Sequence, residues 1–584
     1  MIVHRWRAGL GICLTALHLS GCTGGGAQVN PPGNPTPSIA SVNPSGAYAG
    51  FGGFPLTVNG TGFISSSRVH WNGSSRETTF VGSSQLTATI PGADISVPGP
   101  VAVTVVNPAP GGGVSNAFTF KVTPGPTPGT GVVQLISTAA DGTPSNGNSF
   151  TPPAISAAGR FVAFQSDATN LVPGPASGFA DIYVRDTCVG ATAGCTPGTL
   201  RVSVATNGTL ANGNSRSPSI SADGRFVAFD SSATNLAPGS TQINGQADVF
   251  LRDTCIGVPT GCTPTTTRIS MAANGDQANG DSRGASINAS GRFVSFSSSA
   301  TNLIAGDSNA AGAVVRDTCV SIQTGCTPNT TRVSVATDGT LPNAGSGIVS
   351  IGATGRFVTF LSFASNLVPG DTNGQPDAFV RDTCSGASAG CMPSTIRVSV
   401  ASDGTQANGR TDNSSPSPIT PDGRFVAFTS FATNLVPGDT NGLADVFYRD
   451  TCVGVPPGCT SSTIRASVVF DDTQANEGSG DPSVSADGRL VAFDSLATNL
   501  IYGGTRAPKS VYLRDTCIGT SQACITTTIL LAAKITDGLQ GNGVDTNPSI
   551  SADGHFVAFM SNATNLVAGG SNGNVQIFLA RTGF

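Results

Sequence analysis

The sequence predicts an all-β protein in which a small β-sandwich is followed by a seven-bladed β-propeller that an N-terminal strand closes. Three observations support this. The 584 residues include 75 glycines and 38 prolines but only 11% charged residues, which favours turns over charged helices. The stretch SISADGRFVAFDSSATNL (219–236) recurs in seven similar copies. Six accompanying cysteine pairs are spaced 64 to 68 residues apart, and such a period filled by four strands is typical of propeller blades.

The N-terminus predicts a lipoprotein export signal over residues 1–21. A positively charged start precedes the apolar run LGICLTALHL, which is too short to span a membrane. The ending Leu19-Ser20-Gly21-Cys22 resembles the bacterial lipobox. The resemblance implies lipidation of Cys22, a membrane contact through the lipid anchor only, and, with Thr23 following, the outer membrane. The alternative is an ordinary signal peptide with a chance cysteine. We expect an exported, lipid-anchored protein of the outer membrane, cell surface or periplasm.

Residues 22–35 are expected to form the lipidated cysteine and a flexible tether, and residues 36–122 a β-sandwich. Short alternating segments, LTVNGTGF, RVHWNG, QLTATIP and VAVTVVNP, are separated by turn residues. Together with the start PSIASVNPSGAYAG and the end NPAPGGGVSNAFTFKV, they resemble the IPT/TIG family of immunoglobulin-like domains. That family serves as a spacer or binding module, and the resemblance brings no catalytic residue. Residues 123–131 are expected to be a Pro/Gly linker.

Residues 132–584 are expected to form the propeller. In each repeat SISA predicts an inner strand, Asp-Gly a tight turn, and RFVAF a strand covered on both faces. DVFLRD predicts the third strand and RVSVA the fourth. The last repeat stops after its third strand, and the segment VVQLIST (132–138) resembles a fourth strand that could complete it. The Ser-x-Asp-Gly-Arg turn before an apolar strand resembles the TolB-type WD-like propeller family, which implies a fold but no function.

The cysteines after the signal, apart from Cys22, form six pairs with identical spacing. Zinc sites favour closer spacing and need further ligands, whereas histidine is nearly absent, so we expect six local disulfides. Each would join the third and fourth strands of one repeat. The pairs are Cys188/Cys195, Cys255/Cys262, Cys319/Cys326, Cys384/Cys391, Cys452/Cys459 and Cys517/Cys524.

Two loops, GDTNGQPD (370–377) and GDTNGLAD (438–445), are weak calcium candidates. Carboxylate and amide oxygens lie at positions 1, 3 and 7 around a glycine, and calcium prefers such ligands. The loops lack the bidentate glutamate of an EF-hand. The alternative is an Asx turn that leads into a strand. The corresponding loops of other repeats keep only some of these residues, which favours the alternative. The candidate ligands are Asp371, Asn373 and Asp377 in the first loop and Asp439, Asn441 and Asp445 in the second.

An Arg-Asp dipeptide ends the third strand of six repeats, and its repetition indicates a structural role such as inter-blade ion pairing. The dipeptides are Arg185/Asp186, Arg252/Asp253, Arg316/Asp317, Arg381/Asp382, Arg449/Asp450 and Arg514/Asp515.

No catalytic residue is assigned. Only His70 and His555 remain after the predicted signal, so a serine or cysteine mechanism lacks a base. The G-x-S-x-G match GDSRG (280–284) lies in a repeat loop and not in the strand-turn-helix context of a nucleophile.

The expected function is a non-catalytic binding or scaffolding module of the cell envelope, with a protein or glycan as partner. The formal charge of −5 and the lack of a basic face exclude nucleic acid. The polar loops ATNLVPGDTNG and ATNGTLANG are expected to share one face of the propeller, where the central funnel is the first choice for a ligand. The alternatives are a glycan-active enzyme that uses aspartates, and a structural spacer without a specific ligand.

Overall fold

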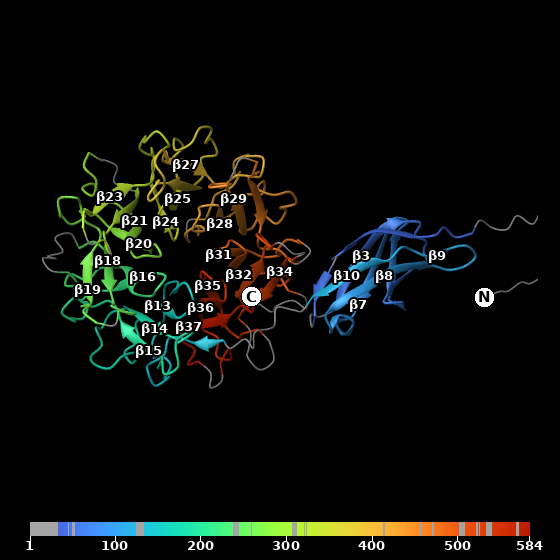
Figure 1. Cartoon of the computed structure of the whole chain (residues 1–584), viewed down its shortest axis with the longest axis horizontal. Coiled ribbons are helices and arrows are strands. Elements are labelled where there is room, and N and C mark those ends of the chain that lie inside the picture. The colour runs from blue at the N-terminus through green and yellow to red at the C-terminus, as the bar shows by residue number, and fades with distance from the viewer. Residues whose placement is uncertain are drawn as a thin grey trace, which may run out of the picture. The chain divides into compact units, whose positions relative to one another are not determined.

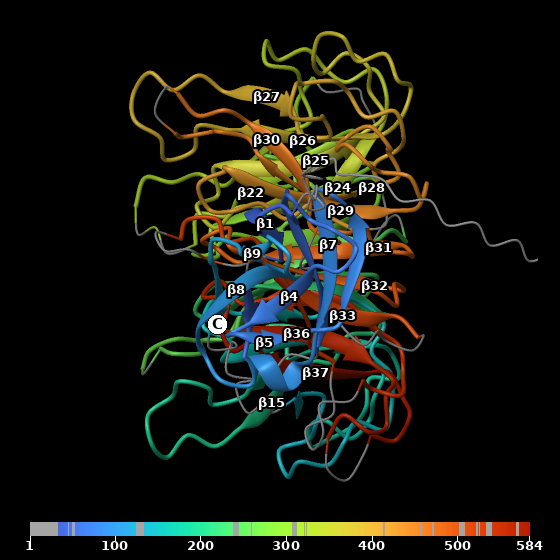
Figure 2. The ribbon, with the colours of Figure 1, turned by 90° about the vertical axis from the view of Figure 1, so that its right-hand side faces the viewer.

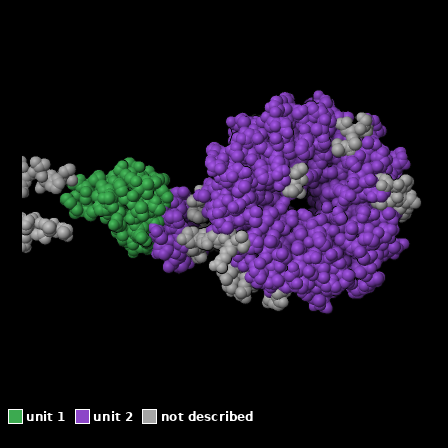
Figure 3. Space-filling model, turned by 180° about the vertical axis from the view of Figure 1, so that it is seen from behind, with its two compact units in different colours: residues 1–42, 57–88, 102–119 green, residues 43–56, 89–101, 120–584 purple. Residues whose placement is uncertain are grey.

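The structure, a computed structural model, describes residues 33–44, 46–49, 53–123, 133–237, 245–258, 260–306, 312–320, 322, 324–412, 415–455, 458–469, 472–501, 508–520, 524, 526–532, 540–567 and 571–584. The predicted signal, Cys22 and linker residues 124–131 lie outside this part. Two compact units divide the chain: residues 1–42, 57–88 and 102–119, and residues 43–56, 89–101 and 120–584 (Figure 3).

Residues 34–123 form two small β-sheets, as the alternating segments predict. One sheet has the strand order β1-β3-β7-β6, and the other has the order β2-β10-β8-β4-β5 with β9 paired to β8. Figure 2 labels β1, β4, β7 and β8 among these strands. The elements are β1 (Ser38–Asn43), β2 (Gly46–Tyr48), β3 (Phe54–Thr61), β4 (Arg68–Trp71), β5 (Ser74–Ser75), β6 (Thr78–Gly82), β7 (Gln85–Ile90), the 3-10 helix η1 (Gly92–Ile95), β8 (Gly99–Asn107), β9 (Gly113–Val114) and β10 (Phe118–Thr123).

Alternate residues of these strands are buried. Leu56 and Val58 of β3 and Val103 and Val105 of β8 are fully buried, while the residues between them are not. This alternation is the pattern of strands that turn one face to a core.

The repeat region contains seven antiparallel sheets among its described residues, and Figure 1 shows them around a common centre. The first strands are β12 (Ala154–Ile155), β16 (Ser215–Ile220), β20 (Ser282–Ile287), β24 (Ser346–Ile351), β31 (Ser479–Val484) and β35 (Asp545–Ile550). The second strands are β13 (Phe161–Ser166), β17 (Phe226–Ser231), β21 (Phe293–Ser298), β25 (Phe357–Ser362), β28 (Phe425–Ser430), β32 (Leu490–Ser495) and β36 (Phe556–Ser561). Six of these sheets have four strands. The fifth has three among its described residues, because its predicted inner strand is reduced to the isolated bridges Thr411–Ser430 and Ile419–Val426. The all-β architecture and the four-stranded sheets fit a propeller-like fold.

The third strands are β14 (Asp181–Asp186), β18 (Asp248–Asp253), β22 (Gly312–Asp317), β26 (Asp377–Asp382), β29 (Asp445–Asp450), β33 (Ser510–Asp515) and β37 (Gln576–Arg581). The fourth strands are β15 (Gly198–Arg201), β19 (Thr265–Arg268), β23 (Asn329–Arg332), β27 (Ser394–Arg397), β30 (Ser462–Arg465) and β34 (Thr527–Leu530). The short strand β11 (Gln134–Leu135) pairs antiparallel with β37, so the seventh sheet combines both ends of the repeat region.

The predicted fourth strand RVSVA is displaced in the structure. β15 ends at Arg201, and the residues that follow leave the ladder because the Ser203 hydroxyl accepts the Ile182 amide at 2.9 Å. The Val204 amide then donates to the Val202 carbonyl at 2.8 Å, which bends the chain. The segment VVQLIST behaves in the same way: its regular strand covers Gln134–Leu135, and Ser137 accepts the Ile577 amide at 3.0 Å.

The Asp-Gly turn joins neighbouring sheets, which explains why the eighteen-residue stretch recurs. Gly224 has a positive φ of 80°, and a Cβ atom there would overlap the ring of Phe161 in the preceding sheet. The Ala222 amide at this turn donates to the Ala289 carbonyl of the following sheet at 3.0 Å. At the ends of the region, the Asp553 amide donates to the Ala157 carbonyl at 3.2 Å and so links the seventh sheet to the first.

The second strands are buried on both faces, as predicted from RFVAF. All six residues of β17 are buried. One hydrophobic cluster joins Phe161 and Val184 of the first sheet to Phe229 and Phe250 of the second. The core therefore lies between adjacent sheets.

Candidate functional site

The polar loops of the repeats meet on one face. We call this the polar-loop face; it comprises the connections between second and third strands and those between one repeat's fourth strand and the next repeat's first. The Asn212 side chain donates to Thr234 Oγ1 at 2.7 Å and accepts the Thr234 amide at 2.7 Å. Asn235 accepts the Asn212 amide at 3.2 Å. These bonds clasp the two kinds of loop together.

This clasp occurs in all seven repeats. Its members are Asn146/Thr169/Asn170, Asn212/Thr234/Asn235, Asn279/Thr301/Asn302, Asn343/Ser365/Asn366, Asn408/Thr433/Asn434, Asn476/Thr498/Asn499 and Asn542/Thr564/Asn565. The recurring ATNL is therefore explained by loop architecture. Because the clasps hold the loops, the polar-loop face presents a preorganised surface.

The first calcium candidate surrounds an arginine. Arg397 Nη1 lies 3.3 Å from both Asp371 Oδ1 and Asp377 Oδ2. Asn373 donates to Asp377 at 3.1 Å and to the Ala407 carbonyl at 3.0 Å. Burial raises the pKa of Asp377, which the hydrogen bond from Ser399 opposes. The Arg397 guanidinium therefore supplies the positive charge that calcium would provide in the metal-site hypothesis.

The second calcium candidate has the same arrangement. Arg465 Nη2 lies 3.3 Å from Asp439 Oδ2, and Arg465 Nε lies 3.4 Å from Asp445 Oδ2. Asn441 donates to the Ala475 carbonyl at 3.0 Å and accepts the Leu443 amide at 2.9 Å, which is the Asx-turn geometry. Arg465 and the two aspartates are almost fully buried. These contacts favour the structural interpretation of both loops, in which an arginine and not calcium neutralises the aspartates.

The protein is expected to have the same Tm in calcium as in a chelator, because Arg465 already contacts the two aspartates of the loop. Replacing Arg465 with Met is expected to lower the free energy of unfolding by about 3 kcal/mol, since two buried carboxylates lose their counter-ion. Differential scanning calorimetry in both buffers measures each effect. A Tm that rises in calcium and no longer does so in Asp439→Asn would restore the metal hypothesis.

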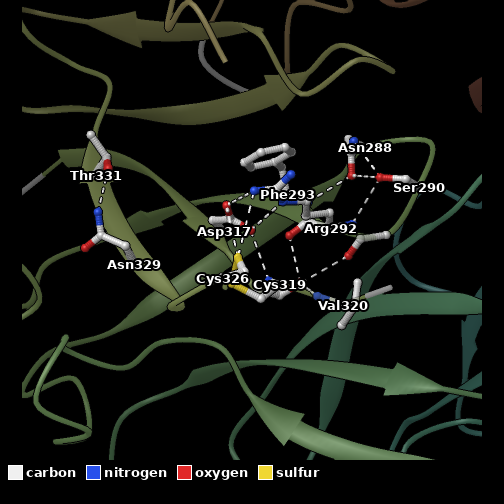
Figure 4. Close-up of polar contacts among 12 residues, drawn as sticks. Asn288, Ser290, Arg292, Phe293, Asp317, Cys319, Val320, Cys326, Asn329 and Thr331 are labelled. Carbon is white, nitrogen blue, oxygen red and sulfur yellow. Dashed lines mark hydrogen bonds and ion pairs between the residues drawn. A yellow bond between two sulfur atoms is a disulfide. The ribbon is translucent and has the colours of Figure 1, made fainter. Parts of the chain in front are cut away.

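The opposite face carries the six predicted disulfides, which the structure confirms: each links the two cysteines of one pair, from Cys188–Cys195 to Cys517–Cys524. Figure 4 shows one of these sites. Arg292 Nε and Nη2 donate to the two oxygens of Asp317 at 2.8 and 2.6 Å, and Asp317 Oδ1 accepts the Cys319 amide at 3.0 Å. The aspartate therefore fixes both the turn arginine and the start of the cysteine loop.

The Arg-Asp dipeptides were predicted to form ion pairs between blades. For the aspartate this prediction is wrong, because its partner lies in the same sheet. Asp253 pairs with Arg225 of its own sheet at 2.7 Å, since the antiparallel register brings the two strand ends together. The arginine does cross between sheets, but to a backbone carbonyl: Arg252 donates to the Ala205 carbonyl at 3.4 Å. The equivalent arginines Arg185, Arg316, Arg381, Arg449 and Arg514 make the same type of contact. Arg514 also forms an ion pair of 2.9 Å with Asp472 of the preceding repeat, so the prediction of an inter-blade ion pair is correct for this arginine.

The serine of the GDSRG match is buried at the start of a strand. Ser282 lies in β20 and shares a hydrogen bond of 2.9 Å with Ser298 of β21. His70 contacts the Gly73 carbonyl in β4's turn, and His555 contacts the Phe584 carbonyl, so neither activates Ser282.

A pocket of about 340 Å³ opens on the polar-loop face between the first and second sheets, and sequence reasoning missed it. Its lining residues are Phe150, Thr151, Gln165, Ala180, Asn214 and Arg216. The signal that could have indicated it is Pro152-Pro153, which directly precedes the short inner strand β12 of the first repeat. Figure 3 shows the second unit from behind, hollowed at its centre.

Comparisons with known proteins show the domain class of the N-terminal part. Residues 37–122 match the family model of the IPT/TIG domain, so this segment is an IPT/TIG domain as predicted. A search of the curated proteins finds no match. No helix among the described residues is long and apolar enough to cross a membrane.

Solved structures similar to the chain include a TolB-like protein of Agrobacterium tumefaciens, 15% identical, which covers 63% of this chain and 91% of its own with a TM-score of 0.31. An auxiliary nutrient binding protein of Bacteroides thetaiotaomicron is 9% identical and covers 94% of this chain and 98% of its own with a TM-score of 0.31. The six disulfides indicate an exported protein.

Proposed function

We propose that the chain is a non-catalytic binding and scaffolding module of the cell envelope, whose repeat region binds a protein or glycan through the polar-loop face. We further propose that the seven sheets are the blades of a closed propeller, and that Cys22 carries a lipid anchor that holds the protein at the outer membrane or cell surface. The IPT/TIG domain would act as a spacer between the anchor and the ring.

The observation that carries this proposal is the combination of seven loop clasps with an open pocket on the same face. Clasped loops lose little conformational entropy when a ligand binds, which favours recognition. The aspartates of the two GDTNG loops have structural partners on this face: Asp377 contacts Arg397, and Asp445 contacts Arg465. The described residues therefore support recognition better than turnover.

Affinity capture tests the proposal. The full chain, expressed with its own leader and purified as the host processes it, is immobilised and exposed to envelope extract, with excess untagged chain as competitor. Parallel extracts are treated with protease or with periodate, which destroy protein and glycan partners respectively. Competed recovery of one protein or glycan is expected. Recovery of nothing in any extract would contradict binding and favour a spacer, and release of shortened glycan chains would identify an enzyme.

A further inference from the structure

The pocket on the polar-loop face contains a buried polar group without a partner. Gln165 in β13 is only 2% exposed, and its Oε1 atom makes no hydrogen bond within the described residues. Thr151 Oγ1, also part of the lining, has no partner either. A buried acceptor without a donor costs about 1–3 kcal/mol, so such a group needs a physical explanation.

Equivalent positions in other repeats show what Gln165 lacks. Asp230, Ser297 and Asp494 occupy the same place in their second strands. Each accepts a backbone amide from the next sheet: Asp230 from Gly284 at 3.2 Å, Ser297 from Ile348 at 2.9 Å, and Asp494 from Asn547 at 3.1 Å. Gln165 Oε1 makes no such bond, and Gln165 is part of the pocket lining.

The first repeat also differs on the other side of the pocket. Its inner strand β12 has two residues, whereas the inner strand β16 of the next sheet has six. The prolines of Thr151-Pro152-Pro153 lack the amide donors that continue a strand. Phe150 precedes them and is 55% exposed, although it is a large apolar side chain beside a polar lining.

The chemistry of the lining defines a ligand class. We propose that this pocket binds a uronic acid unit of an acidic polysaccharide, an inference that rests on the proposed binding function of the polar-loop face. The Phe150 ring offers a flat apolar surface to one face of a sugar. Gln165 and Thr151 line the pocket and add polar side chains for the sugar hydroxyls. Arg216 is the only charged residue of the lining, and a guanidinium suits a carboxylate.

Isothermal titration of the full chain with tri-galacturonic acid tests this inference, with the neutral trisaccharide maltotriose as the comparison ligand. We expect binding of the uronate and at least about tenfold weaker binding after Phe150→Ala or Arg216→Gln. The matched controls are Phe363→Ala, which removes another phenylalanine of similar exposure outside the pocket, and Arg283→Gln, which changes the equivalent arginine of the next repeat. Both controls are expected to bind normally.

Gln165→Met separates binding from folding. Met560 occupies the equivalent position in the seventh repeat, so the ring accommodates this side chain. The variant is expected to keep or raise the Tm, because a buried unpaired acceptor is removed, while its uronate affinity falls. Absence of uronate binding, equal binding of maltotriose, or unchanged affinity in the three pocket variants would each overturn the uronate assignment. If envelope capture still succeeds in that case, the proposed function stands and only the ligand class fails.

Discussion

Raising the pH from about 5 to about 8 is expected to lower the free energy of unfolding by several kcal/mol, because the repeat region buries aspartates whose pKa values are raised. Burial raises the pKa of Asp545 to about 7 and that of Asp230 to about 6. Both side chains lie at the polar-loop end of their strands. Such residues remain protonated in the folded state over a pH range in which they are ionised in the unfolded state.

The sign follows from proton binding. Between the ordinary aspartate pKa of 3.8 and the raised folded value, the folded state binds more protons than the unfolded state, so stability falls as the pH rises. Among the described residues, Asp545 faces the hydroxyls of Ser510 and Ser561 but no cation. Its contribution is up to about 4 kcal/mol over the whole range between the two pKa values, and about 3 kcal/mol of this change falls between about pH 5 and about pH 8.

Asp230 and Asp494 add to the same trend. Asp230 faces Arg216 and Arg283 and accepts the Gly284 amide, which partly offsets its burial. Asp494 faces Asp481 and lies 2.7 Å from Lys509 Nζ. Burial, followed by repulsion from Asp481, raises the pKa of Asp494 to about 8 despite the lysine.

Chemical denaturation across this pH range checks the expectation. Asp545→Ser introduces the serine that Ser215, Ser282 and Ser346 place at the equivalent position, so it should fit. The variant is expected to be more stable than the parent near pH 8 and to show a flatter pH dependence. Asp141→Asn, at an exposed acid, is the control and should leave the slope unchanged. A parent protein whose stability rises over this range would contradict the account.

Replacing Ile136 with Asp is expected to lower the free energy of unfolding by about 3–5 kcal/mol, because it places an unpaired charge in a hydrophobic core. Ile136 follows β11, is fully buried, and packs in a cluster with Phe164 of the first sheet and Ile577 and Leu579 of the last. Its amide donates to the Ile577 carbonyl at 2.8 Å. Losing this segment would also free the edge of β37, which favours association between molecules.

The control for this substitution is Leu200→Asp. Leu200 lies in β15, also a fourth strand, but is 45% exposed, so its effect should stay within about 0.5 kcal/mol. Equilibrium unfolding gives both values, and light scattering reports association. If Ile136→Asp were as mild as Leu200→Asp, the N-terminal segment would not be an integral part of the last sheet.

Local patterns predicted much of the fold. The sheets and disulfides were predictable because they depend on interactions within one repeat. The signals were the seven copies of one motif, the Asp-Gly turn and the cysteine spacing. The displaced fourth strand was missed because Ser203 takes a ladder bond through its side chain, which strand propensity does not show. The clasp between Asn212 and Thr234 joins residues of two different loops. In the sequence, each residue looked like an ordinary turn residue, so the bond between them was not predicted.

The candidate sites were harder to predict because their partners are distant in sequence. The sequence of the GDTNG loop reveals its oxygen ligands but not their partner Arg465. This arginine lies on the next strand, twenty residues beyond Asp445, and neutralises that carboxylate. Gln165 looks like any polar residue until it is compared with Asp230, whose partner Gly284 belongs to another sheet. Such contacts depend on how neighbouring repeats pack, which a repeat consensus does not specify.

Hydrogen exchange of the full chain, with and without envelope glycan, tests the central claim most directly. The account predicts protection on binding in the polar-loop segments around 144–152 and 209–217, and unchanged exchange in the cysteine loops. Protection confined to the cysteine loops, or to the IPT/TIG domain, would place the binding surface elsewhere and contradict it.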